Sequence, residues 1–264
     1  MNTDTALKYR RQLTDDGFCV IENVVPESLL EELRVETDRL LDSVEHPEHW
    51  KYQGSDLHVR GSENDVIDRL DKLPAARQAL DAMGLVDFKS RGGFIILSKP
   101  PGGPALYWHQ DWTQWNDPIS AAPWPQYLFL SYYLVDTSVE NGCFQAIPGT
   151  HRQRIPLHDK LAVAHTDASY FAPESEQHLF GEPDGAVDVP VKAGSLVIGE
   201  GRMLHAARAN QSLNRRTLLL GWYDRPATIP DYWTGSVPEE ILSRRPDTTW
   251  PSTREPGVYL KPHG

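Results

Sequence analysis

The most chemically suggestive stretch of this sequence is YWHQDWTQW, residues 107–115, in which aromatic side chains surround one histidine and one aspartate. His109 and Asp111 are separated by a single residue, and on an extended segment side chains two positions apart point to the same side. A histidine and a carboxylate placed in this way can occupy neighbouring positions around one metal ion. The alternative is a core histidine beside a solvated acid, so the rest of the chain has to decide.

The triplet by itself carries little information. The chain has 10 histidines and 37 acidic residues among 264, so chance alone predicts about 1.4 histidine-x-acid triplets. Three occur, beginning at His46, His109 and His165. His109 alone is flanked by bulky aromatic residues directly before a region of strands, whereas His165 lies in a long polar segment. This context favours His109 and Asp111 as a metal-binding pair.

A third ligand must come from elsewhere, and the candidate is His205 in the segment GEGRMLHAARANQS, 96 residues after His109. Two histidines and one carboxylate leave three coordination positions open, which suits Fe(II) that has to bind both a cosubstrate and O2. The competing interpretation is that His205 packs at a strand end.

Two arginines follow this histidine and stand at the start of an apolar strand, Arg215 and Arg216 in RRTLLLGWY. Burying a guanidinium is costly unless an anion pairs with it, and a carboxylate is the natural bidentate partner. The residues therefore suggest an iron triad together with an anchor for a dicarboxylic cosubstrate. The alternative is that both arginines are solvated at the strand edge.

The elements that must position these residues are two helices followed by many short strands. Apolar residues at helical spacing predict a helix over 27–44 and a shorter one over 74–83. Alternating or continuous apolar runs predict strands over 16–25, 94–98, 126–136, 143–148, 186–191, 196–200 and 216–224. Strands do not alternate with helices, so we expect a mainly β fold, an antiparallel sandwich or barrel buttressed by helices.

We expect a single domain over residues 1–264, because neither an internal repeat nor a low-complexity linker divides the chain. Its parts are a helical N-terminal support over about 1–90, a β core over about 91–225 and an irregular, proline-rich C-terminal tail over 226–264.

The composition limits the partners. A net charge of −11 argues against nucleic acid or an anionic membrane as partner, and no apolar run is long enough to span a bilayer. The two cysteines, Cys19 and Cys143, lie in apolar segments and form no disulfide framework. The N-terminal MNTDTALKYRRQ lacks the apolar core of a secretory signal, so a cytoplasmic location is expected. Oligomeric state is left open.

Four motifs in the same order resemble the phytanoyl-CoA dioxygenase family of iron- and 2-oxoglutarate-dependent oxygenases. They are DGFCVIENVVPESLLEELR, WHQD, ENGCFQAIPGTHR and HAARANQSLNRR, and they extend over nearly the whole chain. The resemblance implies a double-stranded β-helix, the cupin-like jelly roll, in which His109, Asp111 and His205 bind Fe(II). It also implies that Arg216 holds the distal carboxylate of 2-oxoglutarate, with Arg215 facing the other way along the strand.

The resemblance has one departure and one further consequence. Family members often carry a serine two residues after the distal histidine, where this chain has Ala207, so Ser131 is a candidate substitute for that hydroxyl. Related halogenases have a small residue at the position of Asp111, and its carboxylate therefore implies a hydroxylase. The stretch YWHQDWTQW also resembles ectoine hydroxylases, which implies a substrate-binding role for Trp115.

The predicted long strand supplies a cavity lining. Tyr127, Phe129, Ser131 and Tyr133 share one of its faces, which we assign to the substrate and cosubstrate pocket, and Gln145 is polar within a strand and is assigned to the cosubstrate.

We therefore expect a dioxygenase that uses Fe(II), 2-oxoglutarate and O2 to oxidise a C–H bond of a small organic metabolite, releasing succinate and CO2. A free molecule is preferred over an acyl-CoA, because no cluster of basic residues suggests a site for the CoA moiety. The alternatives are a cupin-like iron oxygenase that does not need 2-oxoglutarate, and a non-catalytic β-sandwich binding protein.

Overall fold

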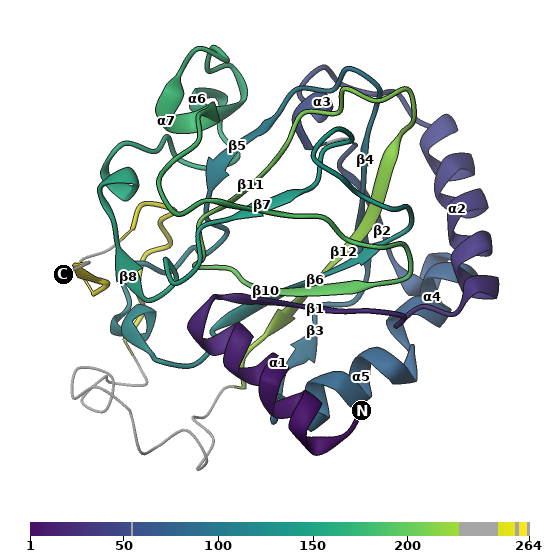
Figure 1. Ribbon diagram of the computed structural model, residues 1–264, viewed down its shortest axis with the longest axis horizontal. Coiled ribbons are helices and arrows are strands. Elements are labelled where there is room, and N and C mark those ends of the chain that lie inside the picture. Colours follow the sequence, from purple (N-terminus) through teal and green to yellow (C-terminus); the bar gives the residue numbers. More distant parts are fainter. Residues whose placement is uncertain (54, 227–247, 257–258, 263–264) are drawn as a thin grey trace.

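The computed structural model describes residues 1–53, 55–226, 248–256 and 259–262. Its core consists of two β-sheets, with the N-terminal helices outside the larger one (Figure 1). The larger sheet contains, in spatial order, β1 (Phe18–Ile21), β10 (Leu196–Glu200), β6 (Tyr127–Tyr133), β12 (Arg216–Asp224), β4 (Phe94–Lys99) and β2 (Leu57–Val59), with β3 (Lys89–Ser90) paired to β12. The smaller sheet contains β5 (Leu106–His109), β11 (His205–Ala207), β7 (Phe144–Ala146) and β9 (Val187–Val189). All pairings within both sheets are antiparallel, so the predicted mainly β, jelly-roll fold is confirmed.

The helices of the described residues are short apart from two near the N-terminus. The α-helices are α1 (Thr3–Asp15), α2 (Glu27–Asp42), α3 (Trp50–Gln53), α4 (Asp65–Asp71), α5 (Pro74–Ala82), α6 (Asp167–Tyr170) and α7 (Gln177–Phe180), and the 3-10 helices are η1 (Gly61–Glu63), η2 (Pro118–Ala121) and η3 (Pro156–Asp159). Helices α2 and α5 follow their predicted ranges closely. Within the described part of the chain, no helix is both long and apolar enough to span a bilayer.

Helix α1 was not predicted, because few of its residues are apolar. Only Ala6 and Leu13 of its residues are buried. The helix begins where the Asn2 side chain accepts a hydrogen bond from the Thr5 backbone N–H, at 2.9 Å, which satisfies one of the free donors of the first turn. It packs against β1 and completes the apolar layer between helices and sheet.

The core between the two sheets determines the position of the cavity described below. Strand β6 is buried over its whole length, with β10 on one side and β12 on the other. From it, the Phe129 ring meets the Phe144 ring of the opposite sheet edge to face, with centroids 6.0 Å apart. Phe129 can lie this way because its neighbour in β10 is Gly199, where a Cβ atom would come within 2.0 Å of the ring.

The described C-terminal residues return to the body of the molecule. Strand β13 (Lys261–Pro262) pairs in parallel with β8 (Gln153–Arg154), and Leu260 is buried in the main core. The Thr253 N–H donates a hydrogen bond of 2.8 Å to the Thr113 carbonyl. Residues 227–247 of the predicted tail lie outside the described residues.

Candidate active site

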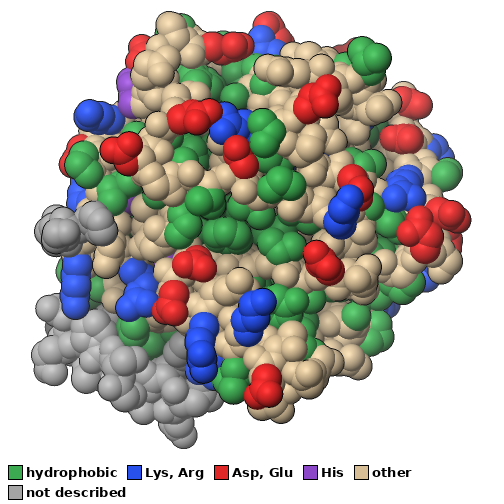
Figure 2. All heavy atoms as spheres, in the orientation of Figure 1, with side chains coloured by type: hydrophobic (Ala, Val, Ile, Leu, Met, Phe, Trp, Pro, Cys, Tyr) green, Lys and Arg blue, Asp and Glu red, His purple; other side chains and the backbone are tan. Residues whose placement is uncertain are grey.

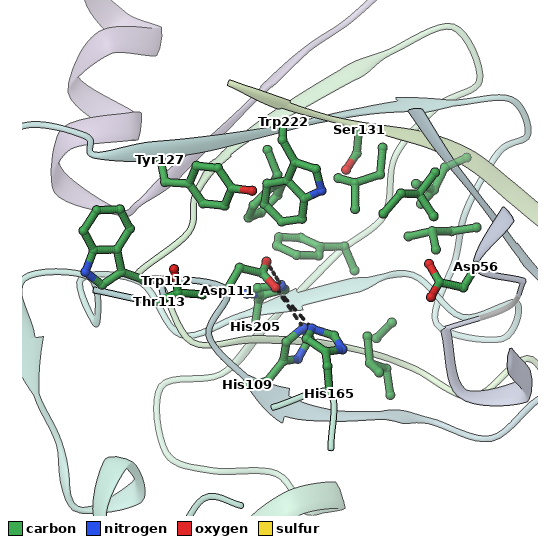
Figure 3. Close-up of a pocket in the computed structure, with 18 of the residues that line it drawn as sticks. Asp56, His109, Asp111, Trp112, Thr113, Tyr127, Ser131, His165, His205 and Trp222 are labelled. Carbon is green, nitrogen blue, oxygen red and sulfur yellow. Dashed lines mark hydrogen bonds and ion pairs between the residues drawn. The ribbon is translucent and has the colours of Figure 1, made fainter. Parts of the chain in front are cut away.

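Strands β5 and β11 bring together the histidines that the sequence predicted as ligands, since His109 and His205 are direct partners in the ladder. Their rings lie 4.2 Å apart, centroid to centroid. The chain leaves β5 after His109, and Asp111 points back so that its Oδ2 is 3.2 Å from His205 Nε2 and its Oδ1 is 3.8 Å from His109 Nε2. The Asp111 carboxylate faces both imidazoles (Figure 3).

The two imidazoles are oriented as metal ligands require. His109 Nδ1 lies 2.9 Å from the Tyr107 carbonyl and His205 Nδ1 lies 3.0 Å from the Met203 carbonyl. A carbonyl only accepts, so each Nδ1 carries the proton and each Nε2 keeps its lone pair for a metal.

The charges of this group also suit a cation. All three side chains are at least nine-tenths buried. Burial holds the pKa of His109 well below its usual range, which keeps the ring neutral. Burial works to raise the pKa of the Asp111 carboxyl, but the imidazoles of His205 and His165 keep it well below its usual value.

The fourth member of this cluster, His165, was rejected in the sequence interpretation. Its Nε2 lies 3.3 Å from Asp111 Oδ1, and its Nδ1 lies 3.2 Å from the Tyr107 hydroxyl. Potential ligand atoms of His109, Asp111 and His165 all fall within 4.8 Å of one another. His165 has a φ of 59°, in the left-handed region that non-glycine residues rarely adopt. A polar loop places this side chain, and no periodic pattern could have indicated it.

A cavity of about 560 Å³ opens over this cluster. One face of β6 lines this cavity with Tyr127, Phe129, Ser131 and Tyr133. Ala207 of β11 lines it as well. Trp222 stacks on Tyr127 with ring centroids 4.7 Å apart and planes within 1° of parallel, and these two rings form the wall opposite Asp111 in Figure 3. Ser131 lies farther along the same wall.

Arg216 lines the cavity at the Tyr133 end of β6. It is only 4 % exposed, and its Nε has no hydrogen-bond partner among the described residues. Burial lowers the pKa of its guanidinium, and burial, followed by the charge of Arg216, lowers the pKa of the neighbouring Lys99. Arg215 points away and donates to the Ser98 carbonyl at 3.3 Å. A buried cation without a counter-ion fits a cavity that receives a carboxylate.

Two predicted site residues lie elsewhere. Trp115 is fully buried in the main core and does not line the cavity. The chain turns away after Asp111 from the candidate metal cluster, which consists of His109, Asp111 and His205. Gln145 points out of the opposite face of β7, where its amide donates a 3.0 Å hydrogen bond to Asp188. Its strand neighbour Phe144 takes the inward position, since side chains alternate along a strand.

Curated relatives cover most of the chain. An ectoine dioxygenase of Bordetella parapertussis is 26% identical, with 93% of this chain and 83% of that protein covered. An L-proline trans-4-hydroxylase of Streptomyces griseoviridis is 25% identical, with 86% of this chain and 88% of that protein covered. The crystal structure of the epimerase SnoN with Fe3+, alpha ketoglutarate and nogalamycin RO matches with a TM-score of 0.62 and 20% identity over 99% of both chains, and supports the fold.

The phytanoyl-CoA dioxygenase family matches residues 13–218. The predicted enzyme class, a non-haem dioxygenase that uses Fe(II), 2-oxoglutarate and O2, is confirmed by this match and by the dioxygenases and hydroxylases among the relatives. It is this class, rather than an oxygenase without 2-oxoglutarate or a non-catalytic binding protein, that the findings support. The chain belongs to the phytanoyl-CoA dioxygenase family.

Proposed function

We propose that His109, Asp111 and His205 bind the iron, that Arg216 binds the distal carboxylate of 2-oxoglutarate, and that the enzyme hydroxylates a C–H bond of a small free metabolite. The observation that carries this assignment is the buried guanidinium of Arg216, whose Nε has no hydrogen-bond partner among the described residues and which shares one cavity with a histidine–carboxylate–histidine cluster. Iron and 2-oxoglutarate, when bound, supply the oxidising chemistry, with succinate and CO2 as products.

Three protein ligands fit this reaction better than four. A chelating cosubstrate and O2 together need three positions on a six-coordinate iron, which leaves three for side chains. We therefore assign His165 the role of a hydrogen-bond donor to Asp111 Oδ1, which leaves Asp111 Oδ2 directed toward His205 and the metal. The Tyr107 hydroxyl fixes the other nitrogen of His165, as outer partners of metal ligands commonly do.

The remaining side chains bind and exclude water. Phe129, whose ring lies 5.1 Å from that of His205, shields the metal cluster from the side of β6. Ser131 and Tyr133 line the way to Arg216, where Ser131 provides the hydroxyl that Ala207 cannot. The Asp111 carboxylate keeps the position that a halide would need, so hydroxylation is the proposed outcome.

The proposed substrate is small and free. A cavity of about 560 Å³ accommodates 2-oxoglutarate and one molecule of similar size, and the named substrates of the relatives above, ectoine and L-proline, are small metabolites. On the face in Figure 2, acidic and basic side chains are interspersed without a continuous basic stripe, which gives no support to a nucleic-acid partner. A single domain and a cytoplasmic location remain predictions.

The test is iron content and slow succinate release with Fe(II), O2 and 2-oxoglutarate. We expect wild-type protein to bind one iron and release succinate even without substrate, and Asp111→Ala to lose at least about nine-tenths of both. Glu48→Ala is the matched control, because Glu48 belongs to another histidine-x-acid triplet and its side chain is exposed. Full iron content in Asp111→Ala would refute the ligand assignment.

A further inference from the structure

The cavity has two ends, and the register of the central strands separates them. Tyr133 of β6 pairs with Leu218 of β12, close to Arg216, whereas Tyr127 at the other end of β6 pairs with Asp224. Six residues of extended strand separate Tyr127 from Tyr133, a distance of about 20 Å. Phe129 and the metal cluster lie between them. The Arg216 end is the cosubstrate end, which leaves the Tyr127 end for the substrate.

A segment distant in sequence approaches the substrate end. Residues 248–256 run past the chain that follows Asp111, held there by the 2.8 Å hydrogen bond from the Thr253 N–H to the Thr113 carbonyl. On the other side of Arg254, the Pro256 carbonyl accepts a 3.1 Å hydrogen bond from Arg154. Attachments on both sides hold Arg254 over the site.

Arg254 lines the main cavity and also a second cavity of about 270 Å³ that reaches His109 from behind. Within the described part of the chain it forms neither a hydrogen bond nor an ion pair. Burial raises the pKa values of Tyr127 and Tyr170, and in both cases the charge of Arg254 acts in the opposite direction. The guanidinium therefore lies near both phenols, with no carboxylate of its own.

The neighbouring arginine differs in this respect. Arg91 forms two hydrogen bonds to the Asp224 carboxylate, at 2.7 and 2.8 Å, and its guanidinium lies 4.5 Å from the centre of the Tyr127 ring. Its charge is already compensated. The carboxylate of Asp56, which also lines the cavity, lies 3.5 Å from the His58 imidazole. Arg225 also lines the cavity, and it donates a 3.1 Å hydrogen bond to the Pro226 carbonyl. Arg254 is thus a cation at this end that no carboxylate of the described residues pairs with.

We propose, building on the function proposed above, that Arg254 binds a carboxylate of the primary substrate, so that the substrate class is a small carboxylic acid with an apolar body. Arg254 is a specificity-determining residue in this proposal. It holds one end of the substrate while the stacked Trp222 and Tyr127 rings hold the apolar part beside the metal cluster.

The charges at this end favour a singly charged anion. The guanidinium of Arg254 carries one positive charge, which a carboxylate neutralises, whereas a dianionic phosphate would leave an excess negative charge in a cavity that Asp56 and Asp224 also line. A guanidinium also matches the planar geometry of a carboxylate, with two parallel hydrogen bonds.

The test measures binding without turnover. Enzyme loaded with Ni(II) and 2-oxoglutarate is titrated calorimetrically with three acids, L-proline, benzoate and hexanoate, and with the corresponding amides. We expect at least one acid to bind about 10- to 100-fold more tightly than its amide, and Arg254→Gln to abolish this preference. Arg254→Lys should recover part of it, because the charge remains while the fork geometry is lost.

Controls separate this proposal from the proposed function. Arg11→Gln, an exposed arginine on α1, should retain the wild-type preference. The wild type and Arg11→Gln should both bind Ni(II) and 2-oxoglutarate and release succinate without substrate. Failure of those reactions in the wild type refutes the function itself. If they are intact, equal affinity of acid and amide across the panel, including no measurable affinity for either, overturns the role of Arg254, as does an unchanged preference in Arg254→Gln.

Discussion

Two arginines of this protein are almost equally buried, yet they occupy opposite kinds of environment. Arg202 is 1 % exposed and its Nε donates to Glu200 at 2.8 Å, while its other nitrogens donate to the carbonyls of Ser120, Ala122 and Trp124 at 2.7 to 2.9 Å. Arg216 is 4 % exposed, and its Nε has no partner in the described residues.

The comparison teaches that hydrogen-bond satisfaction, and not burial, separates a structural cation from one that awaits a ligand. Arg202 ties the loop before β6 to the chain between β10 and β11, and every polar contact it makes is internal. For Arg216, the cost of desolvating the buried guanidinium is offset only when an anion binds beside it. Loss of the Arg202 side chain should therefore lower the stability of the fold, whereas loss of the Arg216 side chain should weaken cosubstrate binding.

The largest expected effect is on stability. Arg202→Leu leaves the buried Glu200 carboxylate without its cationic partner and removes the guanidinium hydrogen bonds to three carbonyls, so the free energy of unfolding should fall by about 3–5 kcal/mol. Urea unfolding measures this, with Arg11→Leu as a surface control. A loss of only about 0.5 kcal/mol, the size usual at surface positions, would show that Arg202 is not structural.

The second change concerns the other arginine. Arg216→Met removes a buried, uncompensated charge beside Lys99, so the free energy of unfolding should stay within about 1 kcal/mol of wild type or rise. The affinity for 2-oxoglutarate should fall by about 30-fold or more, because a buried charge pair is lost. Calorimetric titration of the Ni(II)-loaded protein measures it. A large loss of stability with intact 2-oxoglutarate binding would reverse our comparison.

The third prediction concerns the pH dependence of stability, which we expect to involve His151. Burial, followed by the charge of Arg202, lowers the pKa of His151 from 6.5 to about 3. The unfolded chain binds this proton near pH 6.5 and the folded chain does not, so stability is complete above that pH and is lost as the pH falls. Between pH 7 and 5 this histidine should cost about 2 kcal/mol.

Urea unfolding at both pH values should show that His151→Gln removes this part of the acid sensitivity. An identical pH dependence in wild type and variant would mean that the histidine is protonated in the folded state.

The fourth prediction concerns the metal cluster. His165→Ala removes the hydrogen bond to Asp111 Oδ1, and the affinity for Fe(II) should fall about tenfold. Competition with a chromogenic chelator measures it under anaerobic conditions. Tyr107→Phe, which removes only the hydroxyl that holds His165, should have a smaller effect in the same direction. A loss as large as that in Asp111→Ala would instead make His165 a ligand.

The smallest effect is expected at the position where this chain departs from its family. Ala207 lines the cavity, and Ala207→Ser adds a hydroxyl that can bond to the cosubstrate. One such hydrogen bond should strengthen 2-oxoglutarate binding by about fivefold at most. Weaker binding would indicate that the hydroxyl crowds a site already served by Ser131.

The parts of the molecule built on strands could be predicted closely. The ranges expected for β10 and β12 match the observed Leu196–Glu200 and Arg216–Asp224, because buried strands leave continuous apolar runs. The period of two along β6 also grouped Tyr127, Phe129, Ser131 and Tyr133 correctly on one face, and all four line the cavity. The family resemblance predicted that Arg216 faces the cavity, and alternation along the strand then predicted that Arg215 faces away, as the structure has them.

The parts built on loops and returning segments could not be predicted. His165 reaches Asp111 from a polar loop in a left-handed conformation, and Arg254 reaches the cavity because Thr253 bonds to a residue 140 positions earlier. Neither position is marked by a periodic pattern of apolar and polar residues in the sequence. The errors at Trp115 and Gln145 have a related cause, since the direction of a side chain after a strand ends, or on a strand of three residues, depends on tertiary packing.

The segment that carries Arg254 is attached to the body by hydrogen bonds at Pro251, Thr253 and Pro256, whereas the histidines of the metal cluster lie on paired strands of the smaller sheet. In the proposed function, the residue that recognises the substrate and the residues that bind the iron therefore belong to separate parts of the fold. New preferences could be installed by exchanging this terminal stretch as a cassette, with the oxidising centre left untouched.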